Sequence, residues 1–98
     1  EKLSIGKTVS AEDLASAISL DSGDIIADTH PPQQASVGLP FVIAELKDTQ
    51  ALEQASINIK GFKKLASQYN TRFVHIYTHS NDEFDVRTRM FAPFDGVP

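Results

Sequence analysis

The sequence contains no cysteine among its 98 residues. A disulfide framework and a thiol nucleophile are therefore excluded, and a zinc ion could be bound only by histidines and carboxylates. A chain of this composition fits a reducing compartment. We therefore expect the protein to be cytoplasmic.

Basic charge and long apolar runs are also scarce. The chain has 9 Lys and Arg against 13 Asp and Glu, a formal net charge of -4, and this balance argues against nucleic acid as a partner. No apolar run approaches the ~20 residues that a membrane-spanning helix needs. Residues 1–4 contain neither an initiator Met nor the apolar core of a signal peptide. We therefore expect no membrane partner and interpret the chain as a segment of a longer polypeptide.

The sequence lacks the Gly-x-Ser-x-Gly and Gly-x-Gly-x-x-Gly motifs of hydrolases and dinucleotide enzymes. Gly6–Thr8 resembles the end of a phosphate-binding loop, but Glu1 stands where that loop requires a glycine, so we predict a linker. His75 and His79 have the spacing of a helical metal pair, yet on a strand they would lie about 13 Å apart. We therefore predict no cofactor and no metal site.

Three segments have the patterns of short helices, namely Ala11–Leu20, Asp48–Gln54 and Ile57–Tyr69. Ser10 and Asp48 are suitable N-cap residues for the first two. Gly61 weakens the third, whose apolar face is formed by Phe62, Leu65 and Tyr69. Lysines off that face should be solvated, and these are Lys60, Lys63 and Lys64.

Four segments have the patterns of strands: Asp24–Ala27, Phe41–Leu46, Arg72–Thr78 and Phe84–Phe91. Phe41–Leu46 is almost continuously apolar and should be the most buried, with Glu45 in an ordinary surface ion pair. Prolines keep Thr29–Gln34 out of a central strand, so we predict a loop or an edge segment there. A polar connection at His79–Glu83 should join the last two strands as an antiparallel pair. We predict an α+β fold with a mixed or antiparallel sheet and short helices.

The last strand alternates between two faces. Phe84, Val86, Thr88 and Met90 fall on one side, and Asp85, Arg87, Arg89 and Phe91 on the other. Two interpretations of Arg87 and Arg89 stay open. The guanidinium groups could pair with a carboxylate of the enzyme or of a substrate, or the stems could pack on the sheet beside Asp85 or a cross-strand carboxylate.

The run Arg89–Pro93, followed by Gly96-Val97-Pro98, resembles the second-half motif of the phenazine-biosynthesis (PhzF-like) isomerase family. The resemblance implies a two-lobed fold like that of diaminopimelate epimerase, in which each lobe is a mixed sheet around a central helix and substrate binds between the lobes. Residues 1–98 resemble the first part of the second lobe, a single partial domain. The acidic turn that follows this motif in the family, Glu-Asp-Pro-Ala-Thr-Gly-Ser-Ala, is absent from the sequence. The catalytic lobe and active-site turn would therefore lie outside it.

The pattern Ser36-x-Gly38-x-Pro40-Phe41 is similar to the strand entry that lines the family's substrate pocket, which in the epimerase group reads Gly-Asn-Pro-His. Leu39 stands where that group has its asparagine, so only the backbones at Gly38 and Pro40 are left as polar contacts. The alternative is a simple turn. The resemblance places five residues near the cleft: Gly38, Leu39, Pro40, Arg89 and Gly96. It places no catalytic residue on this segment.

The resemblance implies a fragment of a cofactor-independent isomerase, which shifts a proton on a small metabolite by acid-base catalysis and is inactive without its other parts. Its partners would be the missing lobe, a central helix covering an open apolar sheet face, a small-molecule substrate and, as is frequent in the family, a second copy. Two alternatives remain. One is a non-catalytic binding or assembly domain of the same fold. The other is an amino-acid epimerase with paired cysteines elsewhere, against which Leu39 argues.

Overall fold

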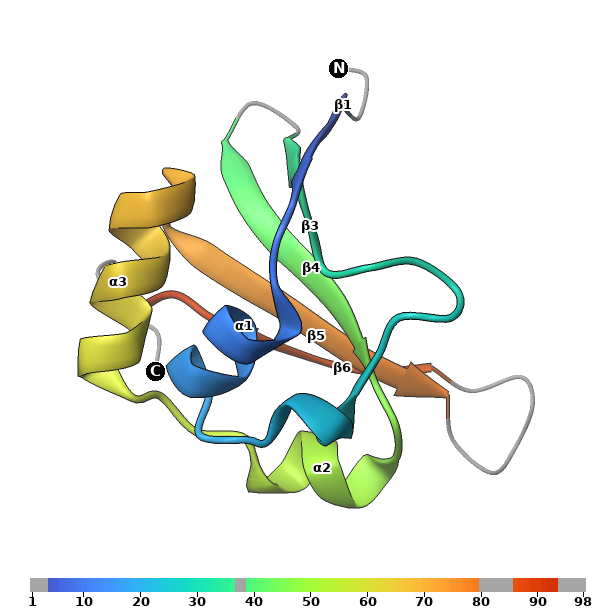
Figure 1. Ribbon diagram of the computed structural model, residues 1–98. Coiled ribbons are helices and arrows are strands. Elements are labelled where there is room, and N and C mark those ends of the chain that lie inside the picture. The colour runs from blue at the N-terminus through green and yellow to red at the C-terminus, as the bar shows by residue number, and fades with distance from the viewer. Residues whose placement is uncertain (1–3, 37–38, 80–85, 94–98) are drawn as a thin grey trace.

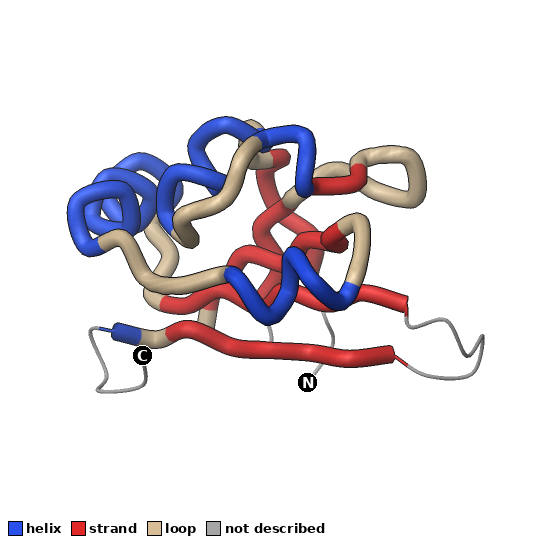
Figure 2. Tube along the Cα trace, turned by 90° about the horizontal axis from the view of Figure 1, so that it is seen from below, coloured by secondary structure: helices blue, strands red, loops and turns tan. Residues whose placement is uncertain are grey.

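The computed structural model describes residues 4–36, 39–79 and 86–93, and among these a single sheet carries helices on one face (Figure 1). The strands are β1 Ser4–Thr8, β2 Ile25–Ile26, β3 Gln33–Ser36, β4 Pro40–Leu46, β5 Phe73–His79 and β6 Val86–Phe91. The helices are α1 Ala11–Ala17, α2 Thr49–Gln54 and α3 Ile59–Tyr69, with a 3₁₀ turn, η1, at Ser22–Asp24. Seen along the sheet in Figure 2, the helices lie on the same side of β6.

The strand order is β1-β3-β4-β5-β6, and β2 pairs with the end of β4. Only β4 and β5 are parallel among the described pairs; the remaining pairs are antiparallel. A parallel pair needs a crossover connection, and here α2 and α3 supply it. The predicted α+β fold with a mixed sheet is confirmed, as is the antiparallel pairing of the last two strands.

The helix starts follow the predicted caps. The Ser10 hydroxyl accepts from the Asp13 N–H at 3.0 Å, and the Asp48 carboxylate accepts from the Ala51 N–H at 2.8 Å. Helix α1 ends at Ala17 rather than Leu20 because Ser19 adopts a left-handed conformation with φ of 63°. Such a residue interrupts the helical backbone.

Two predictions about the sheet edge were wrong. Gly6–Thr8 is not a linker but part of β1, which pairs with β3. Gln33 and Gln34 belong to a strand paired on both sides, by β1 and by β4. Proline removes only its own N–H donor, and the chain places Pro31 and Pro32 just before the strand, where the Pro32 carbonyl accepts from the Val9 N–H at 2.7 Å.

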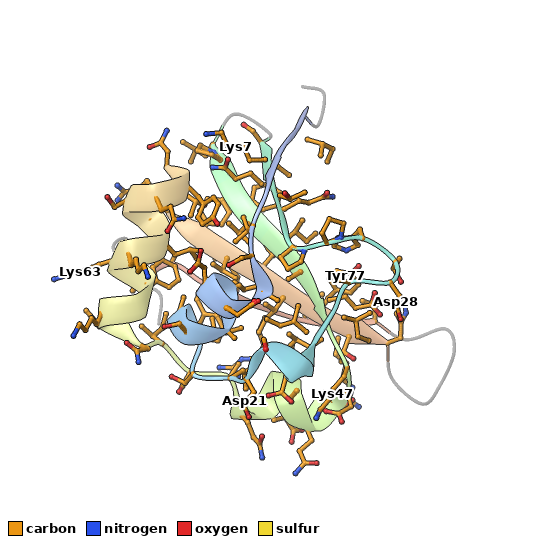
Figure 3. The ribbon with its side chains drawn as sticks, in the orientation of Figure 1. Lys7, Asp21, Asp28, Lys47, Lys63 and Tyr77 are labelled. Atoms are coloured by element: carbon orange, nitrogen blue, oxygen red, sulfur yellow. The ribbon has the colours of Figure 1, made fainter. Side chains whose placement is uncertain are left out.

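The core lies between the sheet and the helices. Strand β4 contributes four buried residues, more than any other described strand, which confirms it as the most buried. The largest fully buried side chains include Phe62 and Leu65 of α3, Leu14 of α1 and Phe91 of β6. The lysines of α3 are exposed as predicted, and Lys63 projects away from the helix in Figure 3.

Gly61 allows α1 and α3 to approach closely. A Cβ atom at this position would lie 2.5 Å from the Ser16 carbonyl oxygen and 2.8 Å from its carbonyl carbon. Both are backbone atoms of the facing helix, so no side-chain rotation could relieve the contact. The residue that weakens α3 by propensity is therefore required by the packing.

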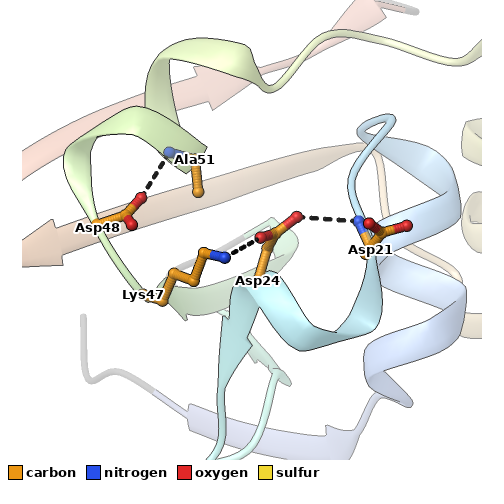
Figure 4. A network of polar contacts seen from close by, with 5 residues as sticks. All are labelled: Asp21, Asp24, Lys47, Asp48 and Ala51. Atoms are coloured by element: carbon orange, nitrogen blue, oxygen red, sulfur yellow. Dashed lines mark hydrogen bonds and ion pairs between the residues drawn. The ribbon is translucent and has the colours of Figure 1, made fainter.

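An ion pair joins η1 to the end of β4 (Figure 4). Lys47 Nζ lies 2.8 Å from Asp24 Oδ1, and the Asp21 N–H donates to Asp24 Oδ2 at 3.1 Å. The Lys47 N–H donates to the Asp24 carbonyl at 2.9 Å. The hydrogen bond from Lys47, with that from the Asp21 backbone, lowers the pKa of Asp24 below its ordinary 3.8. The same contact raises the pKa of Lys47 above 10.5.

Replacing Gly61 with alanine should destabilise the fold by about 1–3 kcal/mol, although alanine favours an isolated helix, because the helices must separate to admit the methyl group. Urea unfolding measures the change. Gly23→Ala is the matched control, since a Cβ there meets nothing within 4 Å. A Gly61→Ala protein as stable as the unmodified one would contradict the close helix contact.

Replacing Asp24 with asparagine should cost stability at pH 7, and this cost should shrink in acid. A folded-state pKa below the unfolded value means that the carboxylate stabilises the fold above about pH 4 and loses this effect as pH falls through the folded-state pKa. Urea unfolding from pH 7 to pH 3 tests this, with the exposed Asp28→Asn as control. A cost that stays constant with pH would refute the assignment.

Candidate functional site

Pro40, one of the predicted cleft residues, lines a hollow. Together with Ile5, Gly6, Gln34, Ala35 and Ser36 it surrounds a space of about 140 Å³ where β1, β3 and β4 meet. Leu39, immediately before it, is 61% exposed. Gly38 and Gly96 lie outside the described residues. Because small-molecule sites commonly measure about 300–1,000 Å³, the hollow can be only one wall of such a site.

Arg89 lies away from this hollow, on the face of β6 that meets the helices. It pairs with Ile76, which lies opposite Ala44 in the middle of β4, so Arg89 is not beside Leu39 or Pro40. Its Nη1 donates to the carbonyls of Leu52 at 2.7 Å and Ala55 at 2.8 Å. A role in lining the cleft stays a prediction.

These contacts place a cation at the C-terminal end of α2, where the helix dipole is negative and carbonyls lack helical partners. The guanidinium carbon also lies 4.7 Å from the centre of the Phe91 ring, a distance typical of cation-π contacts. From the sequence we expected only carboxylates as protein partners for Arg89. The carbonyls at the end of α2 could not be predicted, because only the fold brings α2 over β6.

The opposite face of the sheet is not covered by any described helix or strand. Along β4 and β5 it presents half-exposed rings, with Phe41 and Phe73 stacked at 5.4 Å and His75 edge-on to both. On β6 it presents Val86, 52% exposed, and Met90, 39% exposed. We call this surface the open face. It fits the open apolar face that the family resemblance implies.

Burial sets the protonation of His75 on this face, since it lowers the pKa of the imidazole below its ordinary 6.5. The ring is therefore neutral at pH 7. In this form it packs between aromatic rings without carrying a charge into an apolar surface.

A polar cluster lies at the end of the open face far from Pro40. We define it as His30, Glu45, Tyr77 and His79. The Tyr77 hydroxyl lies 2.6 Å from His30 Nε2, and His30 Nδ1 lies 2.7 Å from the Pro31 carbonyl. A carbonyl can only accept, so Nδ1 carries the proton, and in the neutral ring Nε2 accepts from Tyr77. This bond holds the 27–32 loop against β5.

Glu45 is the residue of this cluster whose environment differs from the prediction. We expected a surface ion pair. Oε2 of Glu45 does lie 3.8 Å from Nε2 of the exposed His79, but Glu45 itself is 6% exposed, between β2 and β5. In the sequence, only the position of Glu45 inside an apolar run indicated that its side chain is buried. Burial and the nearby Glu45 charge raise the pKa of Tyr77 above 10, so its hydroxyl remains a donor.

The described residues provide few groups that could bind a metal ion or a charged ligand. They contain no group of three or more His, Asp or Glu side chains that could hold a metal ion. None of their helices has the length and apolar character needed to cross a bilayer. A second hollow, of about 150 Å³, is polar, but the charges of Asp24 and Lys47 in its wall are already paired.

Replacing Arg89 with methionine should destabilise the fold by about 2 kcal/mol, because two carbonyls at the end of α2 lose a charged donor. Urea unfolding measures the loss. Arg87→Met is the matched control: it lies two residues earlier on the same face of β6 and is exposed. Equal stability of the two variants would show that the contacts with α2 contribute nothing.

No family model matches the sequence, and no curated protein matches it either. Two solved structures are similar to the fold. A PhzF-family phenazine biosynthesis protein from Bacillus anthracis aligns with 93% of this chain at 19% identity and a TM-score of 0.72, and a predicted epimerase from Pseudomonas aeruginosa aligns with 98% at 22% identity and 0.61. The chain spans 30% and 36% of their lengths, about a third of each. The described residues thus have the fold of part of a PhzF-like, epimerase-like protein.

Proposed function

We propose that these residues form part of a PhzF-like, cofactor-independent isomerase that moves a proton on a small metabolite. The observation that carries the proposal is the likeness of 93% of the chain to a PhzF-family protein, at a TM-score of 0.72. In this proposal the segment supplies the sheet and one wall of a cleft, and the acid-base groups belong to other parts of the polypeptide.

The composition of the hollow at Pro40 supports this division of labour. Proton transfer next to a carbonyl needs a carboxylate or imidazole as base and donors that stabilise the developing negative charge. The residues that line the hollow include no acid, no histidine and no cation. They could hold an apolar part of a substrate, and the exposed Leu39 immediately precedes Pro40 in the chain.

The open face supports a further element of the proposal, a covering segment from the same polypeptide. Contiguous exposed apolar surface of this kind is usually buried against another element. The similar solved structures are about three times as long as this chain. We propose a helix and a second lobe as the missing partners. A cytoplasmic location and a homodimer stay predictions from the sequence and the resemblance.

Two other functions remain in competition. A non-catalytic binding domain would account equally for the absence of an acid-base pair around the hollow among the described residues. An amino-acid epimerase is favoured by the Pseudomonas aeruginosa structure, which is described as a predicted epimerase. Leu39 argues mildly against the epimerase, because that group has an asparagine at this place in its pocket.

Deuterium exchange separates these functions. The full-length chain is incubated in D₂O with a panel of small carboxylic acids that carry a C–H next to a carbonyl or double bond, and with a panel of L-amino acids. Mass spectrometry should find deuterium in a member of the first panel. Exchange confined to amino acids would favour the epimerase, and binding without exchange would favour the non-catalytic domain.

Substitution of Leu39 tests the proposed wall of the cleft. Leu39→Asp should lower kcat/KM for the exchanging compound about tenfold, since it places a charge against an apolar part of the substrate. Ile59→Asp is the control, because Ile59 is also a large exposed apolar residue, at 51%, and lies on α3. If both variants keep full activity, Leu39 does not line the cleft.

A further inference from the structure

Glu45 has a buried oxygen without a hydrogen-bond partner. The residue is 6% exposed, and its Oε1 receives no hydrogen bond from the residues that the structure describes. Its Oε2 lies 3.8 Å from His79 Nε2, too far for a hydrogen bond. A buried carboxylate oxygen left in this state is costly, and proteins rarely retain one without a donor or a cation nearby.

Among the residues that the structure describes, the neighbours of Glu45 do not supply that donor. Tyr77 lies opposite Glu45 on β5, but its hydroxyl is already bonded to His30. Ile26, opposite Glu45 on β2, has an apolar side chain. By the alternation of β4, Glu45 shares the side of Phe41 and Ile43, which is the open face. Glu45 therefore lies on the side of the sheet against which a covering segment would pack.

The charge of the open face indicates what kind of donor this is. The positions of β4, β5 and β6 on that side contain no Lys or Arg, and Glu45 is their only Asp or Glu. A cation brought by the covering segment would neutralise this charge, and its hydrogen bond would be stronger than one from a neutral donor. An apolar segment without a cation would instead bury the carboxylate further at a cost.

We propose that Glu45 is the docking point for a Lys or Arg side chain on the segment of the full-length chain that covers the open face. The inference rests on the covering segment of the proposed function and adds the chemistry of one contact. Glu45 lies five residues after Pro40 on β4, about 17 Å along an extended strand. The pair therefore stabilises the packed state and leaves the reaction at the cleft untouched.

The test compares three variants of the full-length chain by urea unfolding. Glu45→Leu should raise the unfolding equilibrium constant at least thirtyfold, because it leaves the partner cation buried and unpaired. Glu45→Gln keeps the shape and one acceptor oxygen but loses the charge, and should raise the constant about tenfold. Glu53→Leu, an exposed residue of α2, is the control and should change it less than threefold.

Whether the substitutions at Glu45 lower or raise the stability of the protein decides between the possibilities. If Glu45→Leu leaves stability unchanged or raises it, the carboxylate has no partner and the proposal fails, since removing an unpaired buried charge is favourable. If Glu45→Gln equals the unmodified protein, the donor is neutral and the assignment of Lys or Arg is wrong. Should Glu45→Leu fail to fold, Glu45→Gln alone still gives this answer.

Two further measurements identify the source of the cation. If the effect of Glu45→Leu disappears in a His79→Asn background, His79 is the partner, which overturns the proposal. If the effect depends on protein concentration, a second copy supplies the cation, which also overturns it. These readouts concern stability alone, so a protein that exchanges no deuterium could still confirm the contact, and an active isomerase could still refute it.

Discussion

The parallel pairing of β4 with β5 is the constraint on which the rest of the structure depends. Two parallel strands cannot be joined by a tight turn, so the chain must leave the sheet and return to its starting edge. Helices α2 and α3 occupy this path and pack on one face. The close contact of α3 with α1 at Gly61, the bond from Arg89 to the end of α2 and the ion pair at Asp24 all secure that same layer. With the helical layer on one side, the aromatic side chains of β4 and β5 are left on the other.

The open face is therefore a consequence of topology as much as of composition. Phe41, Ile43 and Phe73 would be ordinary core residues if a second layer lay against them, and their half-exposure follows from their position on alternate strand sites. The buried carboxylate of Glu45 at one end and the stacked rings of Phe41 and Phe73 at the other give this face two chemically different ends. A segment that packs on it must match both.

Sequence reasoning succeeded where the determining chemistry is local. The caps at Ser10 and Asp48 depend on residues three positions away, and the apolar run of β4 marks a buried strand wherever it is placed. Prediction from the sequence failed where a residue interacts with a part of the chain that is distant in sequence. Gly6–Thr8 becomes a strand only because β3 lies beside it, and Arg89 finds its acceptors only because the crossover returns α2 to the sheet. The burial of Glu45 has the same origin, since strands from two different parts of the chain enclose it. Of the candidate site, the sequence indicated Leu39 and Pro40 but not the polar cluster at the other end.

The connectivity of β4 also has a consequence for synthesis on the ribosome. β4 leaves the ribosome before its parallel neighbour β5, because α2 and α3 lie between them in the chain. During that interval β2 and β3 can pair with it and α1 can pack on its apolar side chains, but no strand lies along its other edge, and loop-closure entropy opposes the pairing with β5. The nascent chain therefore carries an apolar strand with one unpaired edge until the crossover and β5 have emerged, and such an edge is prone to aggregation.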